Sequence, residues 1–303
     1  MKKANALLII LFTVYASLSA QYSMDFGVSL GGSNYVGETG GSGTEPKPGL
    51  LDMNLAKTNI SFGGFYRINF TRNIAAKLSV NYARIGGADS LSGIATQRAR
   101  NLSFRTDIIE ASLVAEYYFF TMNNLSRSSR SRIDFGSYIF AGGGVALFYP
   151  YAQYDNKWYY LRPLQTEGVD NAYDVMTVAV PLGAGATFTF DKKIKLGIEF
   201  GYRFTFTDYL DDISTRYAFE EDLPFQESIL LANRSEEAFR RGDAELAGFA
   251  PYFSEGSRRG NPEANDGYFL GQISISYTIT NRNSFGKARY NKIINRRRKR
   301  TKF

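Results

Sequence analysis

The stretch GYRFTFTDYLDDIST, from Gly201 to Thr215, changes its pattern halfway along. Over its first seven residues Tyr202, Phe204 and Phe206 alternate with glycine, arginine and threonine, which is the period of a β-strand with one apolar face. The alternation ends at Asp208, and two further aspartates follow at Asp211 and Asp212. The stretch therefore predicts a strand that ends where an acidic loop begins.

Seven more segments of the chain share this period of two, so we expect eight strands. Their approximate bounds are Tyr22–Gly37, Ile60–Thr71, Ile74–Gly87, Arg105–Phe120, Asp134–Tyr154, Asp174–Phe190, Ile194–Asp208 and Tyr268–Thr280. Several of them place charges on the face opposite the apolar one. These charged residues are Arg67, Lys77, Glu110, Glu116, Lys195, Glu199 and Arg203.

Two kinds of fold fit strands with one apolar and one charged face. In a soluble β-sandwich the apolar face lies in the core, whereas in a transmembrane barrel it faces lipid and the charges fill the lumen. The connections favour the barrel because most of them alternate between short and long. The short ones are Arg72-Asn73 and 191–193, 121–133 is of medium length, and the long ones are 38–59, 88–104, 155–173 and 209–267.

The sequence therefore predicts an all-β fold: an eight-stranded antiparallel transmembrane β-barrel with short periplasmic turns and long external loops. Eight strands leave room inside only for side chains, so we expect the seven lumen charges to pair across the interior and form a plug. The last loop contains QESILLANRSEEAFRRGDAELA (226–247), which predicts a small helix. A loop of this length is expected to fold over the barrel mouth.

The two ends of the chain differ from its middle. Residues 1–20 begin with Lys2 and Lys3, continue with a short apolar run and end in small residues, as a secretory signal peptide does. The alternative is an uncleaved anchor, although the apolar run is short for a membrane span. We expect residues 21–286 to form the barrel, with both mature ends in the periplasm and residues 287–303 as a basic tail. The predicted location is the cell outer membrane.

The net charge of +7 comes from the ends. Without Lys2, Lys3 and the tail, 25 basic residues remain against 29 acidic ones, a net charge of −4. The basic residues of the tail are Lys287, Arg289, Lys292, Arg296, Arg297, Arg298, Lys299, Arg300 and Lys302. Such a run binds nucleic acid or anionic lipid, docks to an acidic protein or stays solvated. We favour docking to a periplasmic protein partner.

The composition excludes most familiar catalytic sites. The chain has no histidine and no cysteine, which removes the commonest general base, the commonest transition-metal ligand and any disulfide. Asp208, Asp211 and Asp212 have the chemistry of calcium ligands, but a solvated strand end is the simpler interpretation. We therefore expect neither enzymatic activity nor a cofactor.

Five motifs, in order along nearly the whole mature chain, resemble the PorG-like outer-membrane proteins of the Bacteroidetes. They are GVSLGGSNYVGETG (27–40), RNLSFRTDIIEASLVAEYYFF (100–120), KWYYLRPLQTEG (157–168), GYRFTFTDYLDDISTRY (201–217) and GNPEANDGYF (260–269). The resemblance implies a small barrel of the type IX secretion system that helps to attach a periplasmic ring, built by PorK-like and PorN-like proteins, to the outer membrane.

One departure and three alternatives accompany this resemblance. Outer-membrane barrels often end in an aromatic residue that closes the last strand, whereas here the strand ends near Thr280 and a basic stretch follows. A generic surface barrel resembling OmpX, acting in adhesion or envelope stability through its loops, is the main alternative. The second is an outer-membrane enzyme that uses carboxylates in its loops, and the absence of histidine argues against it. The third is a small channel, and a packed lumen argues against it.

Overall fold

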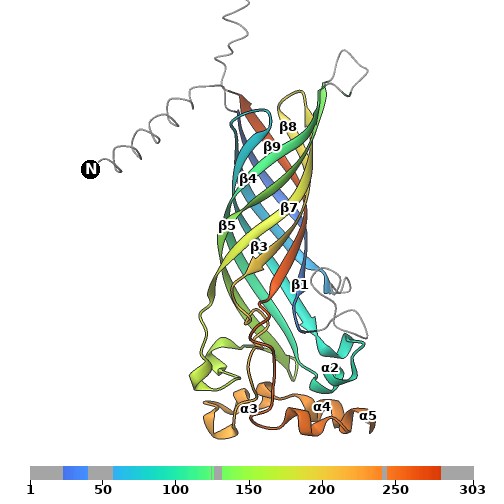
Figure 1. Ribbon diagram of the computed structural model, residues 1–303, viewed down its shortest axis with the longest axis vertical. Coiled ribbons are helices and arrows are strands. Elements are labelled where there is room, and N and C mark those ends of the chain that lie inside the picture. Colours follow the sequence, from blue (N-terminus) through green and yellow to red (C-terminus); the bar gives the residue numbers. More distant parts are fainter. Residues whose placement is uncertain (1–22, 40–56, 124, 126–131, 241–243, 281–303) are drawn as a thin grey trace, which may run out of the picture.

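The computed structural model describes residues 23–39, 57–123, 125, 132–240 and 244–280 (Figure 1). The predicted signal peptide, 1–20, and the predicted basic tail, 287–303, lie outside these residues. No helix within the described ranges is long and apolar enough to cross a membrane.

The described chain folds mainly into long antiparallel strands. Their bounds are β1 (Ser23–Val36), β2 (Asn59–Asn69), β3 (Ile74–Ala88), β4 (Ser103–Met122), β5 (Ile133–Tyr154), β6 (Lys157–Tyr160), β7 (Met176–Phe190), β8 (Ile194–Thr205) and β9 (Gly267–Thr280). Each predicted strand is present, with ends that differ from the prediction by three residues or fewer.

Eight of these strands close into a barrel. Neighbours in the chain pair with each other from β1 to β5 and from β7 to β9, β5 pairs with β7, and β9 pairs back onto β1. The ninth strand, β6, pairs only with the last four residues of β5 and forms a hairpin beyond the barrel wall. The predicted eight-stranded antiparallel barrel is therefore confirmed, with one extra hairpin that the sequence pattern did not reveal.

The outside of the barrel is apolar where the strands predict it. Leu113 on β4 is 58% exposed and Ile273 on β9 is 62% exposed, and such residues recur at every second position around the wall. In water this surface would be far larger than the apolar patches that soluble monomers carry. It matches the lipid-facing band of a transmembrane barrel.

The two ends of the barrel differ sharply (Figure 1). One end carries the tight turn from Asn69 to Ile74 and the turn from Phe190 to Ile194, in which Asp191 and Lys192 adopt positive φ. Ser23 and Thr280, where the described chain begins and ends, pair with each other at this same end. We call it the short-turn end.

The other end is covered by helices and loops, which we call the cap: the described residues of 89–102, 155–175 and 206–266. Its helical segments are η3 (Asp89–Leu91), α2 (Ala95–Arg100), η4 (Arg162–Leu164), η5 (Val169–Asn171), η6 (Glu220–Asp222), α3 (Gln226–Ala232), α4 (Ser235–Arg240), α5 (Ala244–Ala247) and η7 (Ala250–Phe253). A small helix was expected at 226–247, and the structure has three short helices there.

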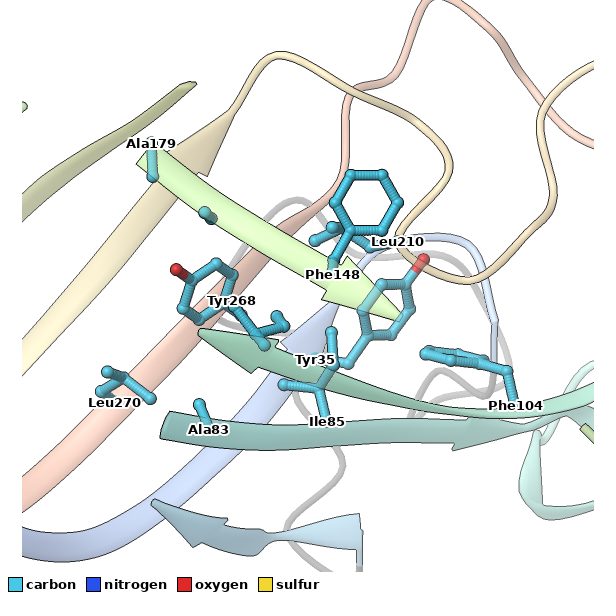
Figure 2. Packing of buried hydrophobic residues seen from close by; sticks show 11 residues of the cluster. Tyr35, Ala83, Ile85, Phe104, Phe148, Ala179, Leu210, Tyr268 and Leu270 are labelled. Carbon is cyan, nitrogen blue, oxygen red and sulfur yellow. The ribbon is translucent and has the colours of Figure 1, made fainter. Parts of the chain in front are cut away.

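A cluster of apolar side chains joins the cap to the barrel mouth. Leu210 of the cap is fully buried against residues of the wall that include Tyr35, Ile85, Phe104 and Phe148 (Figure 2). The hydroxyl of Thr106 on β4 also donates a hydrogen bond to the Leu210 carbonyl, at 2.5 Å. The last loop therefore folds over the mouth, as expected.

Candidate functional site

The seven lumen charges predicted from the sequence all point into the barrel. Arg67 Nε lies 2.8 Å from a Glu116 carboxylate oxygen, and Lys77 pairs with Glu199. Arg203 Nε lies 3.2 Å from Glu110. The structure therefore brings together residues from β2, β3, β4 and β8 that are far apart in the sequence.

Lys195 has a partner that was not predicted from the sequence. Its ammonium lies 2.6 Å from Asp25 of β1, and Arg67 lies 3.9 Å from the same carboxylate. Asp25 alternates with Met24 and Phe26 on a strand that carries apolar residues at every second position, so its place in the lumen could have been read from the pattern. We call these eight charged residues the lumen network.

The lumen network is balanced in charge and supported by hydroxyl groups. It contains four basic residues, Arg67, Lys77, Lys195 and Arg203, and four acidic ones, Asp25, Glu110, Glu116 and Glu199. Tyr138 donates to Glu199 at 2.9 Å, and Tyr268 and Ser112 donate to Glu110 at 2.6 Å and 2.8 Å. Buried charges are tolerated when each has a partner and hydrogen bonds, and here both conditions hold.

The space that remains inside the lumen is very small. The cavity beside Arg67, Lys77 and Glu199 has a volume of only about 20 Å³, which is room for about one water molecule. Large rings fill the rest, and glycines make space for them. A Cβ on Gly183 or Gly201 would lie 2.6 Å or 2.7 Å from the end of the Phe140 ring. The described barrel is plugged by its own side chains.

A second polar cluster lies at the barrel mouth, where the acidic stretch after β8 enters the cap. The Tyr35 hydroxyl lies 2.5 Å from Asp266 and 2.8 Å from Asp211, which come from opposite ends of the last loop. Thr39 also donates to Asp211, at 2.6 Å. A hydroxyl has only one proton to donate, so holding both carboxyl groups requires a second proton on one of them.

The interpretation of these aspartates as a solvated strand end is wrong. Asp208, Asp211 and Asp212 are 5%, 2% and 1% exposed, because the cap folds over them and covers them. Burial raises the pKa of Asp211 to about 7 and that of Asp212 to about 6. Burial, with repulsion from Asp211, raises the pKa of Asp208 to about 8. By contrast, Glu220, Glu221 and Asp222 are exposed.

Asp212 belongs to a separate network that holds the loops of the cap together. Arg259 donates to Glu167 at 3.0 Å and to the Asp212 carbonyl at 2.5 Å. Glu167 in turn accepts hydrogen bonds from the backbone of Ser214 and Thr215, at 2.8 Å and 2.9 Å. These contacts connect the third loop, through Glu167, to both ends of the last loop.

The described residues contain no group of three or more carboxylates placed to hold a metal ion. The calcium alternative for Asp208, Asp211 and Asp212 is therefore not supported. Trp158 of the β6 hairpin is 46% exposed, and its ring lies against the Arg105 guanidinium. The candidate docking residues of the tail, Lys287 to Lys302, lie outside the described residues.

All five motifs meet at the barrel mouth and cap. Tyr35 comes from the first motif, Arg100 and Thr106 from the second and Glu167 from the third. The fourth supplies the buried aspartates, and the fifth supplies Asp266. Arg100 pairs with Asp89 at 2.7 Å and donates to the Arg259 carbonyl at 3.0 Å, so the second loop is tied to the last one. Each motif therefore contributes at least one residue to the contacts at the mouth or in the cap.

Solved structures similar to the described barrel are small barrels with low identity. The N-terminal β-barrel domain of Pseudomonas aeruginosa OprF is 10% identical, with a TM-score of 0.34, and the match covers 85% of this chain and 97% of that one. Ail of Yersinia pestis, in complex with the heparin analogue sucrose octasulfate, is 10% identical with a TM-score of 0.32, over 86% and 98% of the chains. Neisserial surface protein A is 7% identical with a TM-score of 0.30, over 86% and 97%.

Two comparisons concern the sequence. No curated protein matches the chain. The profile of a family described as "Domain of unknown function (DUF6089)" matches residues 2–227, which is most of the sequence.

Proposed function

Since the chain belongs to the DUF6089 family, whose description gives no function, we propose a function from the structure: a non-enzymatic anchor in the cell outer membrane. The single observation that carries this proposal is a plugged, charge-balanced lumen inside a barrel whose outer wall is apolar. An apolar wall holds the protein in lipid, and a plugged lumen leaves no path for a solute. What remains for such a barrel to do is to hold something at the membrane.

The orientation in the membrane follows from the two ends. Short turns and both chain ends face the periplasm in outer-membrane barrels, and long loops face outward. In this orientation the cap lies outside the cell and the strand ends Ser23 and Thr280 lie at the periplasmic surface. We propose that the predicted basic tail, residues 287–303, lies on this periplasmic side, where a partner can bind it.

The partner is proposed from the resemblance to PorG-like proteins. On this proposal the chain is a component of the type IX secretion system and attaches the periplasmic ring of PorK-like and PorN-like proteins to the outer membrane. The nine basic residues from Lys287 to Lys302 form the docking arm. Electrostatic attraction to an acidic surface of the ring would supply speed and specificity of association.

The experiment that tests the proposal is a pull-down of a tagged copy from outer membranes in mild detergent, with mass spectrometry of the proteins that copurify. The ring proteins are expected with the full chain and are expected to be depleted when residues 287–303 are deleted. Recovery of the barrel alone, under conditions in which the ring stays intact, contradicts ring attachment.

The cap favours one second candidate, a surface barrel that acts in adhesion or envelope stability. Ordered loops tied by Arg100, Glu167 and Arg259 present a fixed surface on the outer side, which a periplasmic anchor does not need. This candidate predicts that replacing cap residues changes adhesion or detergent sensitivity, and that deleting the tail has no effect.

A further inference from the structure

We infer that the outer wall carries a site for the phosphate group of an anionic lipid, formed by Arg105 together with Tyr151 and Trp158. The inference depends on the barrel spanning a membrane and not on ring attachment. We call these three residues the arginine–aromatic site.

The arginine–aromatic site is built across three neighbouring strands. Arg105 of β4 pairs in register with Tyr151 of β5, and Tyr151 pairs with Tyr160 of β6. The Arg105 guanidinium carbon lies 4.1 Å from the centre of the Trp158 ring and 5.4 Å from that of Tyr151. The hairpin that extends beyond the barrel therefore places Trp158 over an outward-facing arginine.

Arg105 has no acidic partner among the described residues. Its neighbour Arg84 shows the contrast, because Arg84 Nε lies 2.7 Å from Asp107 and is neutralised by it. Arg105 forms no such ion pair, and its Nε atom is buried without a hydrogen-bond partner in the described structure. The stacked rings hold the guanidinium in place but do not compensate its charge, so the site favours an anion.

The position along the barrel identifies the source of that anion. The outer face of β4 changes from apolar to charged toward the cap. Leu113 and Ile109 are exposed apolar residues, and Asp107 and then Arg105 lie nearer the cap. Arg105 lies four residue steps from Ile109 along a tilted strand, a rise of about 10 Å along the barrel axis. Tyr149, Tyr151, Tyr160 and Trp158 gather at this level as an aromatic girdle does at a membrane–water interface.

Lipid phosphates lie at the level of such a girdle, so the anion at hand is the headgroup of a lipid already next to the wall. A guanidinium offers a planar fork of donors that matches a phosphate, and stacking on a ring fixes that fork before binding. A lipid also keeps its acyl chains against the apolar wall below, which a free phosphate ion cannot do. These contacts favour a lipid of the leaflet at the cap end.

The chain offers a built-in probe of this site, because Trp158 is its single tryptophan. The full chain is placed in nanodiscs of phosphatidylcholine that contain increasing mole fractions of phosphatidic acid, and Trp158 emission is recorded. We expect a saturable change in emission. Arg105→Gln is expected to need about a fivefold higher mole fraction, the factor for about 1 kcal/mol lost per arginine near an anionic surface.

Arg105→Lys and Arg240→Gln provide the controls. The lysine variant keeps the charge without the fork and is expected to fall between the wild type and Arg105→Gln. Arg240 is an exposed residue of the cap, so its replacement is expected to leave the response unchanged. The heat-dependent mobility of each variant in gels verifies that its barrel is folded.

Three results overturn the inference. The first is a wild-type chain that does not respond to phosphatidic acid, and the second is an Arg105→Gln variant whose response equals that of the wild type. The third is an equal response to inorganic phosphate in discs of phosphatidylcholine alone, which assigns the site to a soluble anion.

Discussion

At the scale of the residue, the Arg203–Glu110 pair shows how the interior depends on matched charges. Both side chains are buried, and Glu110 also accepts hydrogen bonds from Ser112 and Tyr268. The ion pair adds little folding stability compared with an apolar pair of the same shape. Removing one partner is costly, however, because the charge of the other stays buried without a counterion.

Arg203→Met is therefore expected to destabilise the folded barrel by about 3–5 kcal/mol, because Glu110 loses its counterion. Urea unfolding in lipid vesicles, followed by Trp158 fluorescence, measures the change. Arg240→Met is the matched control, since the exposed Arg240–Glu236 pair within α4 contributes only about 0.3–0.5 kcal/mol. Equal stability of the two variants would show that the lumen network does not hold the barrel together.

The carboxyl groups at the mouth predict a dependence of cap stability on pH. Burial holds the pKa values of Asp212, Asp211 and Asp208 at about 6, 7 and 8, above the value of about 4 for an exposed aspartate. The closed cap thus binds more protons than an opened cap. The contribution of these aspartates to the stability of the cap is therefore fully present below about pH 4 and is lost as pH rises through these values.

Hydrogen exchange of residues 206–217 measures this effect. After correction for the intrinsic exchange rates, we expect the free energy of opening to be larger at pH 5 than at pH 8.5. The double variant Asp208→Asn with Asp211→Asn is expected to make this pH dependence weaker. The other charged groups near these three aspartates are not changed in this variant. They are Glu38, Arg100, Glu167, Asp266 and Arg259. Greater protection at the higher pH would contradict the assignment.

The sequence predicted which residues point inward, but not all the contacts they make. Alternation assigns Arg67 and Glu116 to one face of their strands, because side chains in a strand alternate strictly. Which charges then meet depends on the tilt and stagger of the barrel, which alternation does not contain. Burial of Asp211 was missed for a similar reason: only the packing of Leu210 into the mouth shows that the loop turns inward.

At the scale of the element, β7 and β5 show how the strands leave room for the plug. Gly185 of β7 faces Tyr138 of β5, and a Cβ there would lie 2.5 Å from the tyrosine ring. Gly143 of β5 lies in the same wall, but a Cβ on it would meet nothing within 4 Å. The two glycines therefore differ in whether the fold needs them.

Gly185→Ala is expected to destabilise the barrel by about 1–3 kcal/mol through overpacking against Tyr138. Gly143→Ala is expected to leave stability unchanged or slightly improved, because alanine loses less conformational freedom on folding than glycine. Thermal loss of the folded band in gels compares the variants. A larger loss for Gly143→Ala than for Gly185→Ala would contradict the packing of the lumen.

The elements of the wall were predictable and those of the cap were not. A strand shows its period over ten or more residues, so the ends of β4 and β9 could be placed within a few residues. The single helix expected at 226–247 is divided at Asn233, whose backbone is extended and whose side chain accepts from Ser235. Short helices depend on packing within the cap, which local pattern does not reveal.

At the scale of the whole molecule, the barrel combines an apolar wall, a plugged lumen and two unlike ends. This combination predicts that the protein does not conduct ions. Purified full chain in planar bilayers is expected to give no stepwise conductance above that of empty membranes, since the charged side chains and rings fill the lumen. Reproducible open-channel steps would favour the small-channel alternative instead.

Photo-crosslinking in cells tests attachment to the periplasmic ring, because it reports both the orientation of the barrel and its partner. A photoreactive residue replaces Lys192 at the short-turn end, and in a matched strain it replaces Arg240 of the cap. We expect crosslinks from position 192 to the periplasmic ring proteins and none from position 240. Ring crosslinks from the cap, or no ring crosslinks from the short-turn end of a correctly inserted barrel, would contradict it.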